Sequence, residues 1–173
     1  MTDALSTGDF TAIDTETTGL SCAKCRIIEV GAVKFRNWQP VAVFSKLIKP
    51  GGHIPYYITE LTGISDSMVE DSPSFPEISD ELAAFFDSDD IVGHNLTFDL
   101  NFLSSEGFPV YTSGYEFVDT LKIARRKLKK GTDIENHSLS TLCEYYGIDQ
   151  KVHHRALGDA EAAGILLKKL MRT

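Results

Sequence analysis

The amino-acid sequence predicts an α/β fold in which helices flank a mixed, five-stranded sheet. Two observations lead to this prediction. Three consecutive segments rich in Val, Ile and Phe open the chain, and short apolar runs then alternate with stretches whose apolar residues recur at helical spacing. Consecutive strands followed by strands that alternate with helices imply a mixed sheet. The 173 residues match the length of one ordinary domain, so we expect a single domain over residues 1–173.

The five strands fall into two groups. The first three are predicted at Phe10–Glu16, Arg26–Arg36 and Val41–Lys49, where short polar segments separate them and antiparallel pairing is expected. Two shorter strands are predicted at Ile91–Val92 and Phe117–Asp119, inside the region where strands and helices alternate.

The helices are predicted where apolar residues recur at steps of three and four. The first begins near Ser74, with Ser72 or Ser74 as its cap, and the second covers Leu96–Ser105. Three more helices are expected at Thr120–Lys129, Ser138–Tyr146 and Leu157–Met171.

The composition indicates a folded protein of the cytoplasm with no membrane partner. Hydrophobic residues make up 42% of the chain, and no apolar run approaches the ~20 residues of a membrane span. The polar start is unlike a secretion signal, and three cysteines are too few for a disulfide framework. The net charge of −8, taken alone, argues against a nucleic-acid partner, because affinity for phosphates comes largely from basic patches.

Two carboxylates stand at the end of the first predicted strand. Asp14 and Glu16 are two residues apart, so the period of a strand puts both on one face. Their oxygens suit Mg²⁺ or Mn²⁺, and without a cation their mutual repulsion would raise their pKa values. The pair alone is also compatible with an ordinary polar surface.

Two further acidic residues occupy the starts of helices. Asp99 lies in a strongly apolar helix after a short buried strand, where a charge needs a partner or a metal unless it occupies the polar face. Asp159 falls in the first turn of the last helix, and His154 precedes that helix. Asp159 could instead complement the helix dipole, and His154 could be a solvated loop residue.

Together these residues form motifs that resemble a known family. Asp14-x-Glu16, Asn95-x-x-Phe98-Asp99 and His154-x-Ala156-x-x-Asp159 are similar in order and spacing to the three motifs of the DEDDh exonuclease superfamily. This group contains the epsilon proofreading subunit of bacterial replicative DNA polymerase. The resemblance covers nearly the whole chain and includes the segment Ile27-Ile28-Glu29. The segment Asn136-His137-x-Leu139 is similar to an exonuclease domain built into a bacterial replicative polymerase, which favours DNA over RNA.

The resemblance implies an RNase H-like fold and assigns roles to residues. Asp14, Glu16, Asp99 and Asp159 would bind two Mg²⁺ ions, for which Mn²⁺ could substitute, and His154 would act as the general base. His153 is the rival base, but the spacing of five residues to Asp159 selects His154. The residues expected to contact the terminal nucleotide are Thr17, Thr18, Gly19, Leu20, Asn95 and Phe98.

The resemblance therefore implies a metal-dependent 3′→5′ exonuclease that acts in proofreading or repair. It would release nucleoside 5′-monophosphates from a single-stranded DNA 3′ end, with a DNA polymerase subunit as a possible partner. Two bound Mg²⁺ ions reduce the formal charge from −8 to about −4, and binding should be weak and limited to the last few nucleotides. Two alternatives stay open: an exoribonuclease or oligonucleotide hydrolase of the same superfamily, and a non-catalytic polymerase-binding module.

Two features of the sequence have no assigned role. The dense basic run Lys122–Lys130 would guide a strand, contact a polymerase or form a solvated helix face. Cys22 and Cys25 depart from the family pattern, and zinc sites normally need four ligands, so metal binding by this pair is not expected.

Overall fold

The computed structural model describes residues 6–149 and 155–172 of the chain and contains one mixed sheet of five strands. The strands are β1 (Phe10–Thr17), β2 (Ile27–Arg36), β3 (Gln39–Leu47), β4 (Ile91–Gly93) and β5 (Phe117–Asp119). Their order across the sheet is β3-β2-β1-β4-β5. The first three pair antiparallel, whereas β4 pairs parallel with β1 and with β5. The predicted mixed five-stranded sheet is confirmed.

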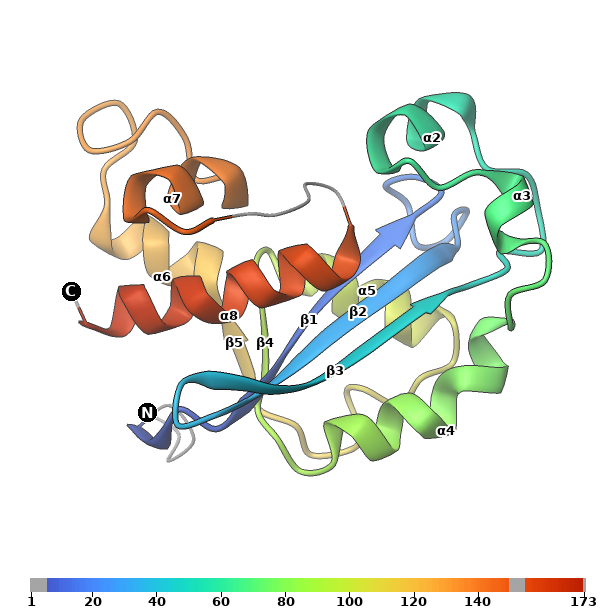
Figure 1. Cartoon of the computed structure of the whole chain (residues 1–173), viewed down its shortest axis with the longest axis horizontal. Coiled ribbons are helices and arrows are strands. Elements are labelled where there is room, and N and C mark those ends of the chain that lie inside the picture. The colour runs from blue at the N-terminus through green and yellow to red at the C-terminus, as the bar shows by residue number, and fades with distance from the viewer. Residues whose placement is uncertain (1–5, 150–154, 173) are drawn as a thin grey trace.

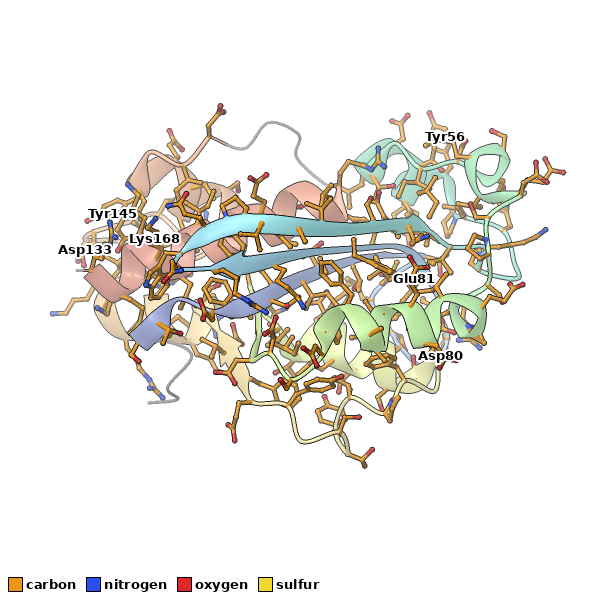
Figure 2. The ribbon with its side chains drawn as sticks, turned by 60° about the horizontal axis from the view of Figure 1, so that its bottom comes forward. Tyr56, Asp80, Glu81, Asp133, Tyr145 and Lys168 are labelled. Atoms are coloured by element: carbon orange, nitrogen blue, oxygen red, sulfur yellow. The ribbon has the colours of Figure 1, made fainter. Side chains whose placement is uncertain are left out.

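Helices cover both faces of this sheet. They are α2 (Tyr56–Thr62), α3 (Asp66–Val69), α4 (Phe75–Phe86), α5 (Thr97–Ser105), α6 (Thr120–Lys127), α7 (Leu139–Tyr146) and α8 (Ala156–Arg172). The long helix α8 crosses one face of the sheet, while α4 and α5 lie on the other (Figure 1). Figure 2 shows the same layers from another side, with the sheet between α4, which carries the labelled Glu81, and α8, which carries Lys168.

Alternating side chains of β1 divide between the two layers of core. Ile13 packs with the apolar residues of α4 and α5, whereas Phe10 and Ala12 pack with Ala160 and Leu167 of α8. Because side chains alternate along a strand, Asp14 and Glu16 continue the face that carries Phe10 and Ala12. The first sequence motif therefore points toward the layer of α8.

Two glycines allow α8 to approach the sheet closely. A Cβ atom on Gly31 of β2 would lie 2.2 Å from the backbone carbon of Ala156 in the first turn of α8. A Cβ atom on Gly164 of the same helix would lie 2.3 Å from the ring of Phe35. Neither site has room for a side chain, so backbone packing sets the distance between β2 and α8.

Most predicted elements are present with ends shifted by a few residues, but two short helices were not predicted. Helices α2 and α3 have seven and four residues, which is shorter than the window over which a helical period can be recognised. They cover a small apolar cluster that includes Ile28 of β2. Ser74, rather than Ser72, is the cap of α4, and it forms a capping box with Glu77.

Within residues 6–149 and 155–172, none of the helices has both the length and the apolar character needed to span a membrane.

Candidate active site

Three of the acidic residues singled out in the sequence meet at one place. Asp14 and Glu16 come from β1, and Asp159 comes from the first turn of α8. One carboxylate oxygen from each lies within 4.8 Å of the others, a separation at which one cation could bind all three. The half-buried side chains lie where the α8 face of β1 meets the start of the helix.

Asp99 is held beside this group by the residue between the two β1 carboxylates. Its Oδ1 atom accepts the backbone N–H of Thr15 at 3.0 Å and the Thr15 hydroxyl at 2.7 Å. The side chain is only 3% exposed, so Asp99 does not occupy a solvated polar face of its helix. The structure thus joins the second motif, on α5, to the first motif on β1.

Burial, together with the charges of neighbouring carboxylates, raises the pKa values of Asp14 and Glu16. Burial and then the charges of Asp99 and Asp159 raise the pKa of Asp14 well above its usual range. Burial, followed by the charges of Asp159 and Glu29, raises the pKa of Glu16 to about 8. Carboxylates crowded in this way need protons or cations to balance them, which is the electrostatic condition of a divalent metal site.

Burial raises the pKa of Asp99 to about 7, against the hydrogen bonds from Thr15, which lower it. The cluster is therefore able to take up protons near neutral pH when no cation is present. Among the described residues, the grouped donors are hard carboxylate oxygens, which favour Mg²⁺ or Mn²⁺ over softer metals.

A fifth acidic residue, Glu29, adjoins the grouped carboxylates, and the sequence alone assigns it no role. Its carboxylate is 1% exposed and binds the guanidinium of Arg155, with an Oε1–Nη2 distance of 2.6 Å. It also accepts the backbone N–H of Ala156 at 2.9 Å. In the sequence, Glu29 stands out only as a charged residue within a strand of Ile and Val. Its pairing could not be predicted, because its partner Arg155 lies 126 residues further along the chain.

The residues predicted to contact the terminal nucleotide form a turn after β1 and the start of α5. The Thr17 hydroxyl donates to the carbonyl of Gly19 at 2.7 Å, and the Thr18 hydroxyl accepts the N–H of Arg26 at 3.0 Å. These two hydroxyls therefore hold the shape of the turn. Leu20 at its tip is 89% exposed, so a large apolar side chain is available for contact with a ligand.

Asn95 and Phe98 lie between β4 and α5. Asn95 adopts a left-handed backbone conformation with φ of 62°, and its N–H donates to Asp119 Oδ1 at 3.0 Å. Phe98 is half-buried, and its ring centroid lies 4.8 Å from that of Phe102. Phe98 therefore contributes to the core as well as to the surface next to Asp99.

The structure does not test the predicted general base, and it describes the cysteine pair as free thiols. His154 and its rival His153 lie outside the described residues, so the general base stays a prediction. Cys22 and Cys25 are free thiols that pack beside the core. In the part of the chain that the structure describes, neither belongs to a group of potential metal ligands.

The sequence profile of the exonuclease family matches residues 11–167. The chain belongs to this exonuclease family. A PolC-type DNA polymerase III from Oceanobacillus iheyensis is 38% identical to the exonuclease over 166 residues, which cover 94% of this chain. They cover only 11% of that polymerase, so the exonuclease spans about a tenth of the length of the curated relatives it matches.

Solved structures show the same fold. A structure of Exonuclease X in complex with 5′ overhanging duplex DNA is 28% identical, with a TM-score of 0.75, and covers 94% of the exonuclease and 91% of that chain. The nuclease domain of 3′hExo, a DEDDh family member bound to rAMP, is 14% identical, with a TM-score of 0.78 and coverages of 96% and 92%. The resemblance to DEDDh exonucleases and the predicted RNase H-like fold are confirmed.

Proposed function

We propose that the chain is a metal-dependent 3′→5′ exodeoxyribonuclease that removes nucleoside 5′-monophosphates from single-stranded DNA ends, in proofreading or repair. The observation that carries this proposal is the convergence of Asp14, Glu16 and Asp159, whose carboxylate oxygens lie within 4.8 Å of one another. Asp99 adjoins them through Thr15. Membership of the exonuclease family supplies the reaction class.

The donor set fits two divalent cations. The ligands would be four partly or fully buried carboxylates: Asp14, Glu16, Asp99 and Asp159. Three of them are grouped, and the pKa values of Asp14, Glu16 and Asp99 are raised. When bound, two such ions stabilise the attacking and leaving oxygens of an in-line displacement at phosphorus. The protein contributes by fixing its oxygens before the substrate arrives, since β1, α5 and α8 are all packed elements of the fold.

His154 would accept the proton of the attacking water. Its ordinary pKa of about 6.5 suits proton transfer near neutral pH. The residue that follows it, Arg155, is bound by Glu29 of β2, so the chain next to His154 is anchored beside Glu16, the register partner of Glu29.

DNA is the proposed substrate because the curated relatives are PolC-type DNA polymerases, and Exonuclease X was solved with duplex DNA. A DNA polymerase subunit is the proposed partner on the same ground. The non-catalytic alternative is disfavoured, because the three grouped carboxylates and Asp99 are intact. The exoribonuclease alternative is tested by the substrate comparison below.

The test is degradation of 5′-labelled single-stranded, mismatched and fully paired DNA with Mg²⁺, alongside an RNA oligomer of the same sequence. We expect single-nucleotide shortening from the 3′ end of single-stranded and mismatched DNA, and none after chelation. Asp14→Asn is the control that assigns the activity to this site. Faster turnover of RNA would favour the exoribonuclease alternative, and intact substrates throughout would refute the proposal.

A further inference from the structure

A hollow of about 1010 Å³ lies between α6, the loop that follows it and the start of α7. We call it the basic hollow, after the cationic residues in its lining, Arg125, Lys129 and Lys130. His94, Asn95 and His137 also belong to the lining, and no carboxylate does among the described residues. In a chain with a net charge of −8, this makes the hollow a local concentration of positive charge.

The basic hollow begins where the candidate active site ends. His94 and Asn95 follow β4 and precede α5, the helix that carries Asp99. Strand β4 runs parallel to β1, with Val92 opposite Ala12, so the end of β4 lies beside the β1 segment that carries Asp14. Ligands of open α/β sheets bind at the carboxyl ends of parallel strands, which is where both features lie.

The floor of the hollow is fixed by hydrogen bonds within the protein. The two ring nitrogens of His94 bond to the Thr120 hydroxyl and to the carbonyl of His137, both at 2.9 Å. The ring of His137 in turn bonds to the carbonyl of Leu128 at 3.0 Å. These contacts join the end of β4 to both α6 and the segment before α7, so little ordering would be needed for a ligand to bind.

The cationic side chains at the rim form no ion pair in the part of the chain that the structure describes. Arg125, Lys129 and Lys130 are exposed, and none of the ion pairs found within the described ranges involves their side chains. Arg125 lies close enough to His94 for its charge to act on that ring. Unpaired guanidinium and ammonium groups around a rigid floor suit the repeated phosphates of a nucleic-acid strand.

We propose that the basic hollow binds the phosphodiester backbone of the substrate strand, upstream of the nucleotide whose 3′ end lies at the carboxylates. This inference rests on the proposed function, because a 3′ end at Asp14 and Asp99 determines which part of the strand reaches the hollow. It also explains how an acidic protein holds an anionic substrate: the upstream phosphates meet the only dense basic run in the sequence.

Helix α6 and the residues that follow it offer a matched pair of variants. Arg125→Ala/Lys129→Ala removes two charges from the basic hollow, whereas Arg126→Ala/Lys127→Ala removes two charges from neighbouring exposed residues that do not line it. All four side chains are exposed, so both variants should fold as the wild type does. Thermal unfolding followed by circular dichroism verifies this.

The two variants are compared on two substrates. On a single-stranded DNA oligomer of about eight nucleotides, the hollow variant should lose on the order of tenfold in kcat/KM, and the control should stay within about twofold. On the p-nitrophenyl ester of thymidine 5′-monophosphate, which has no upstream phosphates, both should match the wild type. The slope of log(kcat/KM) against log[salt] should flatten by about 1.4 for the hollow variant, about 0.7 per lost single-strand contact.

Equal behaviour of the two variants on the oligomer would overturn the inference, as would an equal loss on the mononucleotide ester. Wild-type protein that hydrolyses neither substrate would refute the proposed function instead. Fluorescence anisotropy with a labelled form of the same oligomer then tests binding at the basic hollow independently of hydrolysis. Weaker binding by Arg125→Ala/Lys129→Ala than by the control supports the inference, and equal binding excludes it.

Discussion

The Glu29 carboxylate on β2 and the Arg155 guanidinium form a bidentate ion pair, with Oε1 lying 2.6 Å from Nη2 and Oε2 lying 3.1 Å from Nε. Glu29 also accepts the N–H of Ala156, and the carbonyl of Arg155 accepts the N–H of Asp159 at 3.1 Å. One buried side chain therefore fixes the first turn of α8 against β2. Glu29 lies opposite Glu16 in the register of β1 and β2, so this contact is next to the strand that carries two of the proposed metal ligands.

Glu29→Ala should therefore impair the site more than its effect on folding explains. Loss of the anchor frees the first turn of α8 and with it Asp159, so we expect turnover to fall about 10- to 100-fold and the Mg²⁺ concentration for half-maximal rate to rise. Steady-state kinetics across a Mg²⁺ titration measures both. Glu81→Ala is the control, because Glu81 on α4 pairs with Lys46 at the surface (Figure 2). A rate and Mg²⁺ requirement equal to those of the control would contradict the positioning role.

Thr15→Val should weaken the site through Asp99. The substitution keeps the shape and the backbone N–H but removes the hydroxyl that donates to Asp99 at 2.7 Å. We expect roughly 10-fold weaker metal affinity or activity, as when the partner of a ligand is lost. Thr11→Val on the same strand removes a hydroxyl that donates to Asp89 instead and should leave kinetics unchanged. Metal titration by calorimetry checks both, and indistinguishable affinities would count against this coupling.

The stability of the metal-free protein should fall as the pH rises. Burial and nearby carboxylates raise the folded-state pKa of Glu16 to about 8, and burial raises that of Asp99 to about 7. Groups with raised pKa values stabilise the fold fully below their unfolded pKa, near 4, and lose this contribution as the pH passes the folded value. With chelator present, the melting temperature should drop between about pH 5 and about pH 8.5.

Mg²⁺ should reverse this loss of stability. It should raise the melting temperature more at about pH 8.5, where the carboxylates are ionised, than at about pH 5. Glu16→Gln should flatten the pH dependence in chelator, because it removes one of the titrating groups. A wild-type melting temperature that does not fall with pH, or a Mg²⁺ effect that is equal at both pH values, would refute this account of the cluster.

His154→Ala should keep the fold and the metal affinity but lose about 10²- to 10⁴-fold in turnover, the usual contribution of a general base. His153→Ala should stay near the wild-type rate. Single-turnover hydrolysis of a DNA oligomer at saturating Mg²⁺ separates the two histidines. Comparable losses in both variants, or a normal rate in His154→Ala, would remove the assignment.

The meeting of the three motifs could be predicted because each one stands at the end of a strand or the start of a helix. Asp14, Glu16 and Asp159 are grouped as this placement implies, and Asp99 is linked to them through Thr15. The role of Glu29 could not be predicted, since its carboxylate acts by binding Arg155, which lies 126 residues away in the sequence.

Other features also needed the three-dimensional structure. The basic run gave no way to separate Arg125 from Arg126, because only the path of the loop after α6 shows which side chain lines the basic hollow. Helices α2 and α3 are too short to show a period in the sequence. The mixed sheet flanked by helices, in contrast, followed from the order of the strand and helix segments. The RNase H-like fold followed from the family resemblance.

The most direct test of the central claim is the anomalous diffraction of Mn²⁺ in crystals of the protein soaked with a nucleoside 5′-monophosphate. We predict two peaks, about 3.5–4 Å apart, each contacted by oxygens from the set Asp14, Glu16, Asp99 and Asp159. Peaks only at other residues, or none at this cluster with saturating Mn²⁺, would contradict the account.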